Sequence, residues 1–215
     1  MFPCCQGLGV NAVLGLPKST EIHKLITKKK VYEHFGTEMS AERRKRFDAD
    51  IARMILTNEV SPVSLNIAAG EDVQNFFVLQ VILRAKEFDP QNITFLSKLF
   101  GQRLLMVLEA EGQQRLAVWQ TKLIMTEWAE ADSLTVDLSG LHLDKVWENI
   151  VAEIAGIEIQ QGRTLDEEIA AAAQKDKLRR EIAKLEKAAR AGKQPKQKFE
   201  MAQQIKALQT ELEAI

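Results

Sequence analysis

The chain has 215 residues, of which 46% are hydrophobic and 27% charged, and its formal net charge is −1 at pH 7. This composition is typical of a globular protein and excludes a disordered or collagen-like chain. The charge is segregated, because residues 175–200 hold ten Lys and Arg against four Asp and Glu, whereas residues 1–174 hold 18 against 24. The sequence therefore predicts an acidic body followed by a basic segment.

The first residues predict a loose tail over 1–13 and no targeting signal. No Lys or Arg precedes Lys18, so the basic region of a signal peptide is missing, and no apolar run approaches the roughly 18 residues of a membrane span. Cys4 and Cys5 are adjacent and have no second pair, which disfavours a zinc site and is typical of reduced thiols. We expect a cytoplasmic protein with no membrane contact and no metal.

Residues 16–25 predict a short helix. Pro17 restricts the backbone just before the helix, Ser19 or Thr20 can cap its N-terminus, and Glu21 suits the positive end of the helix dipole. We expect this helix to run through Leu25.

Two further helices follow in residues 28–54. Val31, Tyr32 and Phe35 have helical spacing and end at Gly36. Ser40 is placed to cap a second helix over 41–54, with an inner face formed by Phe47, Ile51 and Met54.

A basic run lies in the first turns of the second of these helices, at Arg43, Arg44 and Arg46. A basic run on a helix is usually a solvated face. Cations near a helix N-terminus oppose the helix dipole, and this local cost favours the alternative of a contact with nucleic acid or an acidic partner. Both interpretations remain open from the sequence.

The central element is the run Val73–Arg84. From Phe76 to Leu83 only Gln80 interrupts the apolar residues, and turn-forming residues flank the run on both sides. Such a short, continuous apolar run predicts a strand buried on both faces, with Phe77 in the core.

The other elements of this part of the chain predict an α+β domain over residues 14–156. We expect a mostly antiparallel five- or six-stranded sheet packed by helices. Strands are expected over 53–60, 65–67, 104–109, 115–119, 122–128 and 134–138, and helices over 90–100 and 142–154.

Beyond a linker over residues 157–163, residues 164–215 predict an antiparallel, coiled-coil-like helical hairpin. Thr164 and Glu167 form a capping box, and two apolar stripes of heptad spacing are separated by a Gly- and Pro-containing turn at 192–195. Each stripe is too short to be stable alone. The hairpin therefore either packs on itself or serves as a docking arm or homodimer contact.

The outer face of this hairpin is basic. It is either a solvated helix surface or a nucleic-acid or partner contact. The residues predicted for the contact are Arg179, Arg180, Lys184 and Lys187.

No catalytic signature is present, so no catalytic, cofactor-binding or metal-binding residue is predicted. The three histidines are scattered, and no carboxylate-x-Lys falls on a predicted core strand. The carboxylates nearest to the predicted strands are Glu59, Glu109 and Glu111.

Several segments resemble a bacterial family known as domain of unknown function 4391. The resemblance includes Leu16-Pro17-Lys18-Ser19-Thr20-Glu21-Ile22, the central strand, the Thr164-Leu165-Asp166-Glu167 box and the region Leu178 to Lys187, and it covers residues 14 to 210. Members are often encoded beside restriction–modification methyltransferases and helicases, which implies a DNA-processing or phage-defence context. The family has no established catalytic residues to assign here.

Two functional hypotheses follow. The preferred one is a non-enzymatic accessory subunit that binds a helicase or methyltransferase, with at most weak nucleic-acid binding and without a cofactor. The alternative is a diverged metal-dependent nuclease that acts on DNA.

Overall fold

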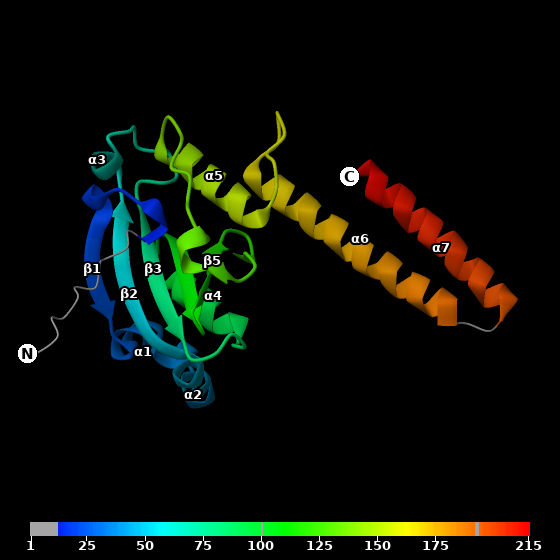
Figure 1. Ribbon diagram of the computed structural model, residues 1–215, viewed down its shortest axis with the longest axis horizontal. Coiled ribbons are helices and arrows are strands. Elements are labelled where there is room, and N and C mark those ends of the chain that lie inside the picture. The colour runs from blue at the N-terminus through cyan, green and yellow to red at the C-terminus, as the bar shows by residue number, and fades with distance from the viewer. Residues whose placement is uncertain (1–12, 100, 192–193) are drawn as a thin grey trace, which may run out of the picture. The chain divides into compact units, whose positions relative to one another are not determined.

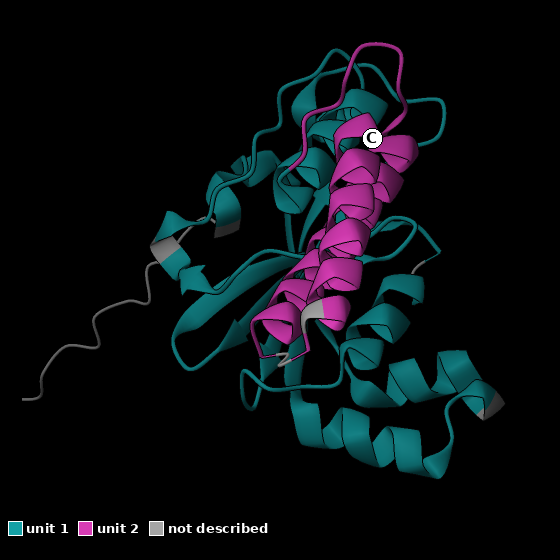
Figure 2. Cartoon of the chain, turned by 90° about the vertical axis from the view of Figure 1, so that its right-hand side faces the viewer, with its two compact units in different colours: residues 1–156 teal, residues 157–215 magenta. Residues whose placement is uncertain are grey.

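The computed structural model describes residues 13–99, 101–191 and 194–215 (Figure 1). The chain divides into two compact units, Met1–Gly156 and Ile157–Ile215 (Figure 2). The tail predicted over residues 1–13 lies, except for Val13, outside the described residues.

The first unit is built on one mixed sheet, which has seven strands among the described residues, in the order β1-β2-β3-β4-β5-β6, with the short β7 also paired to β5. Only the pairing of β3 with β4 is parallel among these ladders. The predicted α+β class with a mostly antiparallel sheet is confirmed. The strands are β1 (Glu21–Ile26), β2 (Ile51–Val60), β3 (Phe76–Leu83), β4 (Arg103–Ala110), β5 (Gln113–Trp119), β6 (Leu123–Met125) and β7 (Ala129–Glu130).

Strand β3 lies inside the sheet between β2 and β4, as its apolar run predicts (Figure 1). Phe76 and Val78 point to one face and Leu79 and Val81 to the other, and all four are fully buried. Phe77, which the sequence predicts in the core, is only partly buried. The central strand is thus confirmed, but Phe76 is its buried ring.

Helices cover both faces of the sheet. Residues of α1, α2 and α4 form one apolar cluster with Leu79 and Val81 of β3. Trp147 of α5 packs on the opposite face, with its ring 5.4 Å from that of Phe76. The helices of this unit are α1 (Lys28–Phe35), α2 (Ala41–Asp50), α3 (Pro62–Leu65), α4 (Pro90–Lys98) and α5 (Leu143–Ala155).

Several predicted helix ends and one turn are confirmed by their local geometry. Ser40 accepts a hydrogen bond from the backbone N–H of Arg43, and Asp89 accepts one from that of Gln91, so both cap helices. The turn between β4 and β5 has positive φ at Glu111 (52°) as well as at Gly112 (76°). Such a two-residue turn matches the twist of an antiparallel hairpin.

The helix predicted over residues 16–25 is wrong. Lys18–Thr20 form a single 3-10 turn, and Glu21–Ile26 then pair with β2 as strand β1. The side chain of Thr20 does not cap a helix but donates to Pro17 O and accepts from Asn58 Nδ2. The ladder to β2 outweighs the local signal for a helix start.

The helix predicted over residues 41–54 is too long. It ends at Asp50, and Ile51 and Met54 belong to β2. The spacing of Phe47, Ile51 and Met54 fits a helix, but strand pairing on both sides of β2 decides the conformation.

Two predicted short strands are also wrong. In residues 65–67, Leu65 ends α3, which begins with a capping box between Ser61 and Ser64, and Asn66 is left-handed with φ 55°. Residues 134–138 alternate between half-buried and exposed side chains but form no strand, and Val136 N donates a hydrogen bond to the distant Leu14 O. The burial of the side chains therefore alternates in this segment without pairing to a strand.

The second unit is the predicted helical hairpin, formed by α6 (Leu165–Ala191) and α7 (Pro195–Ala214) in contact with each other. Thr164 and Glu167 form the predicted capping box, with hydrogen bonds in both directions. Gln174 bonds Glu211, which is consistent with antiparallel helices. Within the described residues, none of the helices combines the length and apolarity needed to cross a bilayer.

Candidate functional site

Arg43 of α2 forms contacts inside the first unit. Its guanidinium pairs with Asp89 at 2.8 Å, bonds Gln91 and lies over the ring of Phe95 at 5.4 Å from the centroid. The side chains of Arg43 and Asp89 are only 22% and 25% exposed. Arg43 therefore joins α2 to the start of α4.

Arg44 is also used within the fold. It donates to Gly36 O at 3.0 Å and lies over the ring of Tyr32. Burial raises the pKa of Tyr32 above its ordinary value, and the hydrogen bond from its hydroxyl to Asp48 acts in the same direction. The phenol thus remains a donor to Asp48, and Arg44 joins α2 to α1.

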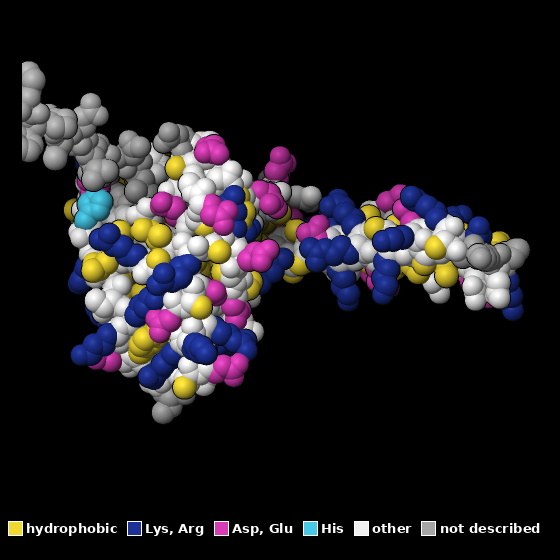
Figure 3. Space-filling model, turned by 60° about the horizontal axis from the view of Figure 1, so that its bottom comes forward, with side chains coloured by type: hydrophobic (Ala, Val, Ile, Leu, Met, Phe, Trp, Pro, Cys, Tyr) yellow, Lys and Arg dark blue, Asp and Glu magenta, His cyan; other side chains and the backbone are white. Residues whose placement is uncertain are grey.

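Arg46 differs from these two, because it is exposed and its ion pair is with Glu42, one turn earlier on α2. The structure therefore does not bring Arg43, Arg44 and Arg46 together as a free basic surface. Figure 3 shows Lys and Arg scattered among acidic and apolar side chains on the face of the first unit that it displays.

The basic residues predicted on α6 lie differently. Arg179 pairs with Asp176 at 3.6 Å. A second set of α6 cations has spacing 3-4-3, so its members share one side of the helix, opposite the buried Leu178 and Ile182. We call this set the α6 cation stripe: Lys177, Arg180, Lys184 and Lys187.

All four members of the α6 cation stripe are exposed, and no ion pair within the described part of the chain involves them. The stripe extends over about 15 Å of helix at 1.5 Å per residue. Figure 3 shows Lys and Arg side chains along the hairpin. The stripe is a linear array of exposed cations.

The carboxylates considered for a nuclease do not meet. Glu59 lies opposite Phe77 and Glu109 opposite Ile82 in the sheet register. Five residues along β3 correspond to roughly 16 Å, and an odd separation places the two carboxylates on opposite faces. They cannot hold one ion between them.

Each of these glutamates instead has amide partners. Glu109 Oε2 accepts from Gln80 at 2.8 Å and from Gln114 at 3.2 Å, and Glu59 accepts from Asn75. The described residues contain no group of three His, Cys, Asp or Glu side chains that could hold a metal. Cys4 and Cys5 lie outside the described residues.

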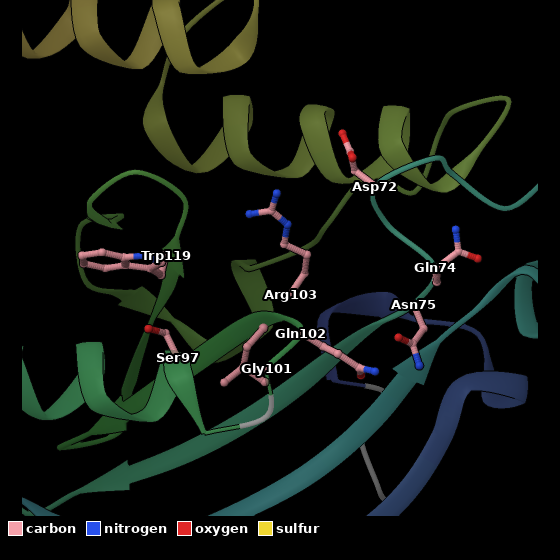
Figure 4. Close-up of a pocket in the computed structure, with 9 residues that line it drawn as sticks. Asp72, Gln74, Asn75, Ser97, Gly101, Gln102, Arg103 and Trp119 are labelled. Carbon is pink, nitrogen blue, oxygen red and sulfur yellow. The ribbon is translucent and has the colours of Figure 1, made fainter. Parts of the chain in front are cut away.

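The structure reveals a pocket that the sequence does not predict (Figure 4). Because β3 and β4 are parallel, with Phe76 opposite Arg103, their amino ends meet at one edge of the sheet. There the loop before β3, Ser97 of α4, residues 101–104 and Trp119 at the end of β5 line a pocket of about 360 Å³. Its walls include Asp72, Asn75, Arg103 and Trp119.

Among the described residues that line this pocket, Arg103 is the one Arg or Lys, and it is held by neutral groups. Its Nη1 donates to Gln120 Oε1 at 2.9 Å, and the same oxygen accepts from Trp147 Nε1 at 3.1 Å. The guanidinium lies 5.9 Å from the ring centroid of Trp147. No carboxylate pairs with Arg103 among the described residues.

The other pocket residues also have distinct positions. Figure 4 shows the Arg103 guanidinium between Trp119 and Asp72. Lys98 Nζ lies 5.8 Å from the ring centroid of Trp119, which brings a second cation near the pocket. The sequence gives only a weak signal for this pocket. An Arg at the first position of a strand indicates a pocket only when the strand that pairs with it in parallel is known.

The fold and these surfaces define an α+β protein with a mixed sheet and a helical hairpin that presents a cation stripe. No curated protein and no solved structure matches the chain. The sequence profile of a family described as a domain of unknown function, DUF4391, matches residues 14–212. The chain therefore belongs to this family, as the resemblance of its motifs predicts.

Proposed function

We propose that this protein is a non-catalytic accessory subunit of a bacterial DNA-processing or phage-defence system, and that its hairpin contacts nucleic acid weakly. The α6 cation stripe is the observation that carries the proposal. It presents four exposed cations on one side of a helix, and none of them has an ion-pair partner among the residues that the structure describes. Neutralising DNA phosphates releases counterions, which makes such an array a sequence-independent contact surface.

The rest of the proposal concerns the partner. The family resemblance implies genes for methyltransferases and helicases in the neighbourhood, and such a large enzyme would supply the chemistry. The accessory subunit binds this enzyme and adds affinity for the DNA backbone. Co-elution of the purified protein with the products of neighbouring genes tests this part.

The nucleic-acid contact is tested by measuring fluorescence anisotropy of a labelled duplex across a salt series. The variant changes Arg180, Lys184 and Lys187 to Gln. Each phosphate contact contributes about 0.9 to the slope of log affinity against log salt, so loss of three contacts lowers its magnitude by up to about 2.7. The matched control changes Lys196, Lys198 and Lys206 of α7 to Gln, which removes the same charge without touching the stripe.

The control should keep most of the wild-type slope. Equal effects of the two triple variants would show a general charge effect and refute a contact at the stripe. Homodimerisation through the hairpin remains a prediction, which light scattering of the full chain tests.

The non-catalytic part of the proposal has its own test. Incubation of supercoiled DNA with the protein and Mg²⁺ should leave the DNA intact. Metal-dependent nicking that disappears in Glu109→Gln would overturn the proposal in favour of a nuclease.

A further inference from the structure

We propose that the pocket at the amino ends of β3 and β4 binds a mononucleotide, with its phosphate on Arg103 and its base against Trp119. This site is separate from the α6 cation stripe and independent of the function proposed for it. The volume of about 360 Å³ lies in the range of small-molecule sites.

Arg103 is the anchor for the anion. Gln120 uses one of the five guanidinium N–H donors and also bonds Trp147, so the side chain is oriented but its charge is not neutralised. The guanidinium fork is suited to bidentate hydrogen bonds with phosphate oxygens. A half-buried Arg held by a neutral amide binds an anion without first losing a carboxylate partner.

Asp72 determines what else the ligand carries. Its backbone N–H is fixed by Asp144 at 3.2 Å, while its carboxylate lines the same pocket as Arg103. No ion pair of Asp72 occurs within the described ranges. A carboxylate on the far side of Arg103 repels additional phosphates, so it favours a ligand with a single phosphate group.

Trp119 and Lys98 provide the other features that a mononucleotide site requires. The half-buried indole of Trp119 offers an aromatic surface, on which a base stacks regardless of its identity. Lys98 lies over that ring and adds a second positive charge close to the pocket. Two cations with one opposing carboxylate suit a single phosphate group better than a di- or triphosphate.

Isothermal titration calorimetry of the full chain tests the proposal. The probes are the four ribonucleoside 5′-monophosphates, their nucleosides, the corresponding 5′-diphosphates and inorganic phosphate. At least one monophosphate should bind, and removal of its phosphate should weaken binding by at least about tenfold. Arg103→Gln should weaken binding of the monophosphate by a similar factor.

Two further variants keep the test decisive if Arg103→Gln does not fold. Asp72→Asn should remove the preference for a monophosphate over a diphosphate, and Trp119→Leu should weaken binding of every monophosphate. The triple Gln variant of Arg180, Lys184 and Lys187 is the control and should bind mononucleotides like the wild type.

Three results with the probes and the pocket variants would overturn the inference. They are the absence of binding of all four monophosphates at millimolar concentration, equal affinity for inorganic phosphate, and affinity unchanged by these pocket substitutions. Loss of binding in the α6 variant would instead place the phosphate on the hairpin and equally reject the pocket.

Discussion

The carboxylate of Asp144 occupies the space that a side chain on Gly70 would need. A Cβ on Gly70 would approach Asp144 Oδ2 to 2.7 Å and Oδ1 more closely still. The carboxylate is held there because it accepts hydrogen bonds from three successive backbone N–H groups, those of residues 71, 72 and 73. This contact joins the start of α5 to the loop that leads into β3 and lines the pocket.

Gly70→Ala should therefore destabilise the protein by about 1–3 kcal/mol, because the displaced carboxylate loses hydrogen bonds in a partly buried site. Urea unfolding measures the change. In an Asp144→Ala background the same substitution should cost less, since the obstructing carboxylate is gone. Equal costs in the two backgrounds would refute the steric relationship.

Asp144 should also make stability depend on pH. Desolvation alone would raise its pKa, but the backbone N–H groups of Val73, Glu71 and Asp72 and the nearby His142 together hold the pKa below its ordinary value. The folded protein therefore favours the ionised carboxylate. This stabilisation is present above the unfolded pKa of about 3.9 and is lost as the pH falls through the lower folded pKa.

The measurement compares the wild type with Asp144→Asn by urea unfolding between about pH 6 and about pH 3, the range around the ordinary carboxyl pKa. The stability advantage of the wild type should shrink toward the acidic end. A difference that stays constant over this range would contradict the assignment.

Phe76 and Phe77 provide a matched pair in the central strand. Phe76→Ala should cost about 3–5 kcal/mol, because a fully buried ring beside Trp147 leaves a cavity. Phe77→Ala should cost less by at least about 1 kcal/mol, since its ring is only partly buried. Denaturant midpoints in the reverse order would show that the assignment of the two faces of β3 is wrong.

Arg43 and Arg46 distinguish a structural role from a binding role. Arg43→Ala should destabilise by about 1–3 kcal/mol, because it breaks a largely buried pair with Asp89. Arg46→Ala should change stability by less than about 0.5 kcal/mol, as expected for an exposed pair on one helix. If both variants keep wild-type stability but lose affinity for DNA, the contact lies on α2 and not on α6.

Truncation after Gly156 should leave the first unit folded. Gly156 ends α5 in the left-handed conformation, and the chain divides into compact units at this point. All three tryptophans lie in the retained part, so their fluorescence should report cooperative unfolding. Truncation after Gly140 is the control and should not fold, because it removes α5 from the sheet. Aggregation of the longer fragment would show that the hairpin is needed for the core.

Local chemistry was sufficient to predict elements whose signals lie within a few residues. Ser40, Asp89 and Thr164 cap helices because their side chains reach backbone N–H groups two or three residues on. The apolar run Phe76–Leu83 predicts a central strand, because such a run is kept from water only when both faces of the strand are covered. The heptad spacing predicts the hairpin because two helices that pack together keep their apolar stripes from water.

Only the tertiary structure decided which partners distant segments take. Glu21–Ile26 form a strand because they pair with β2. Arg43 has a structural role because α4 places Asp89 beside it. The pocket exists because α4 returns the chain so that β4 runs parallel to β3, which brings Arg103 near Asp72. Local sequence determines the conformations that a segment favours, but pairing energies between residues far apart in the chain determine which one persists and which side chains meet.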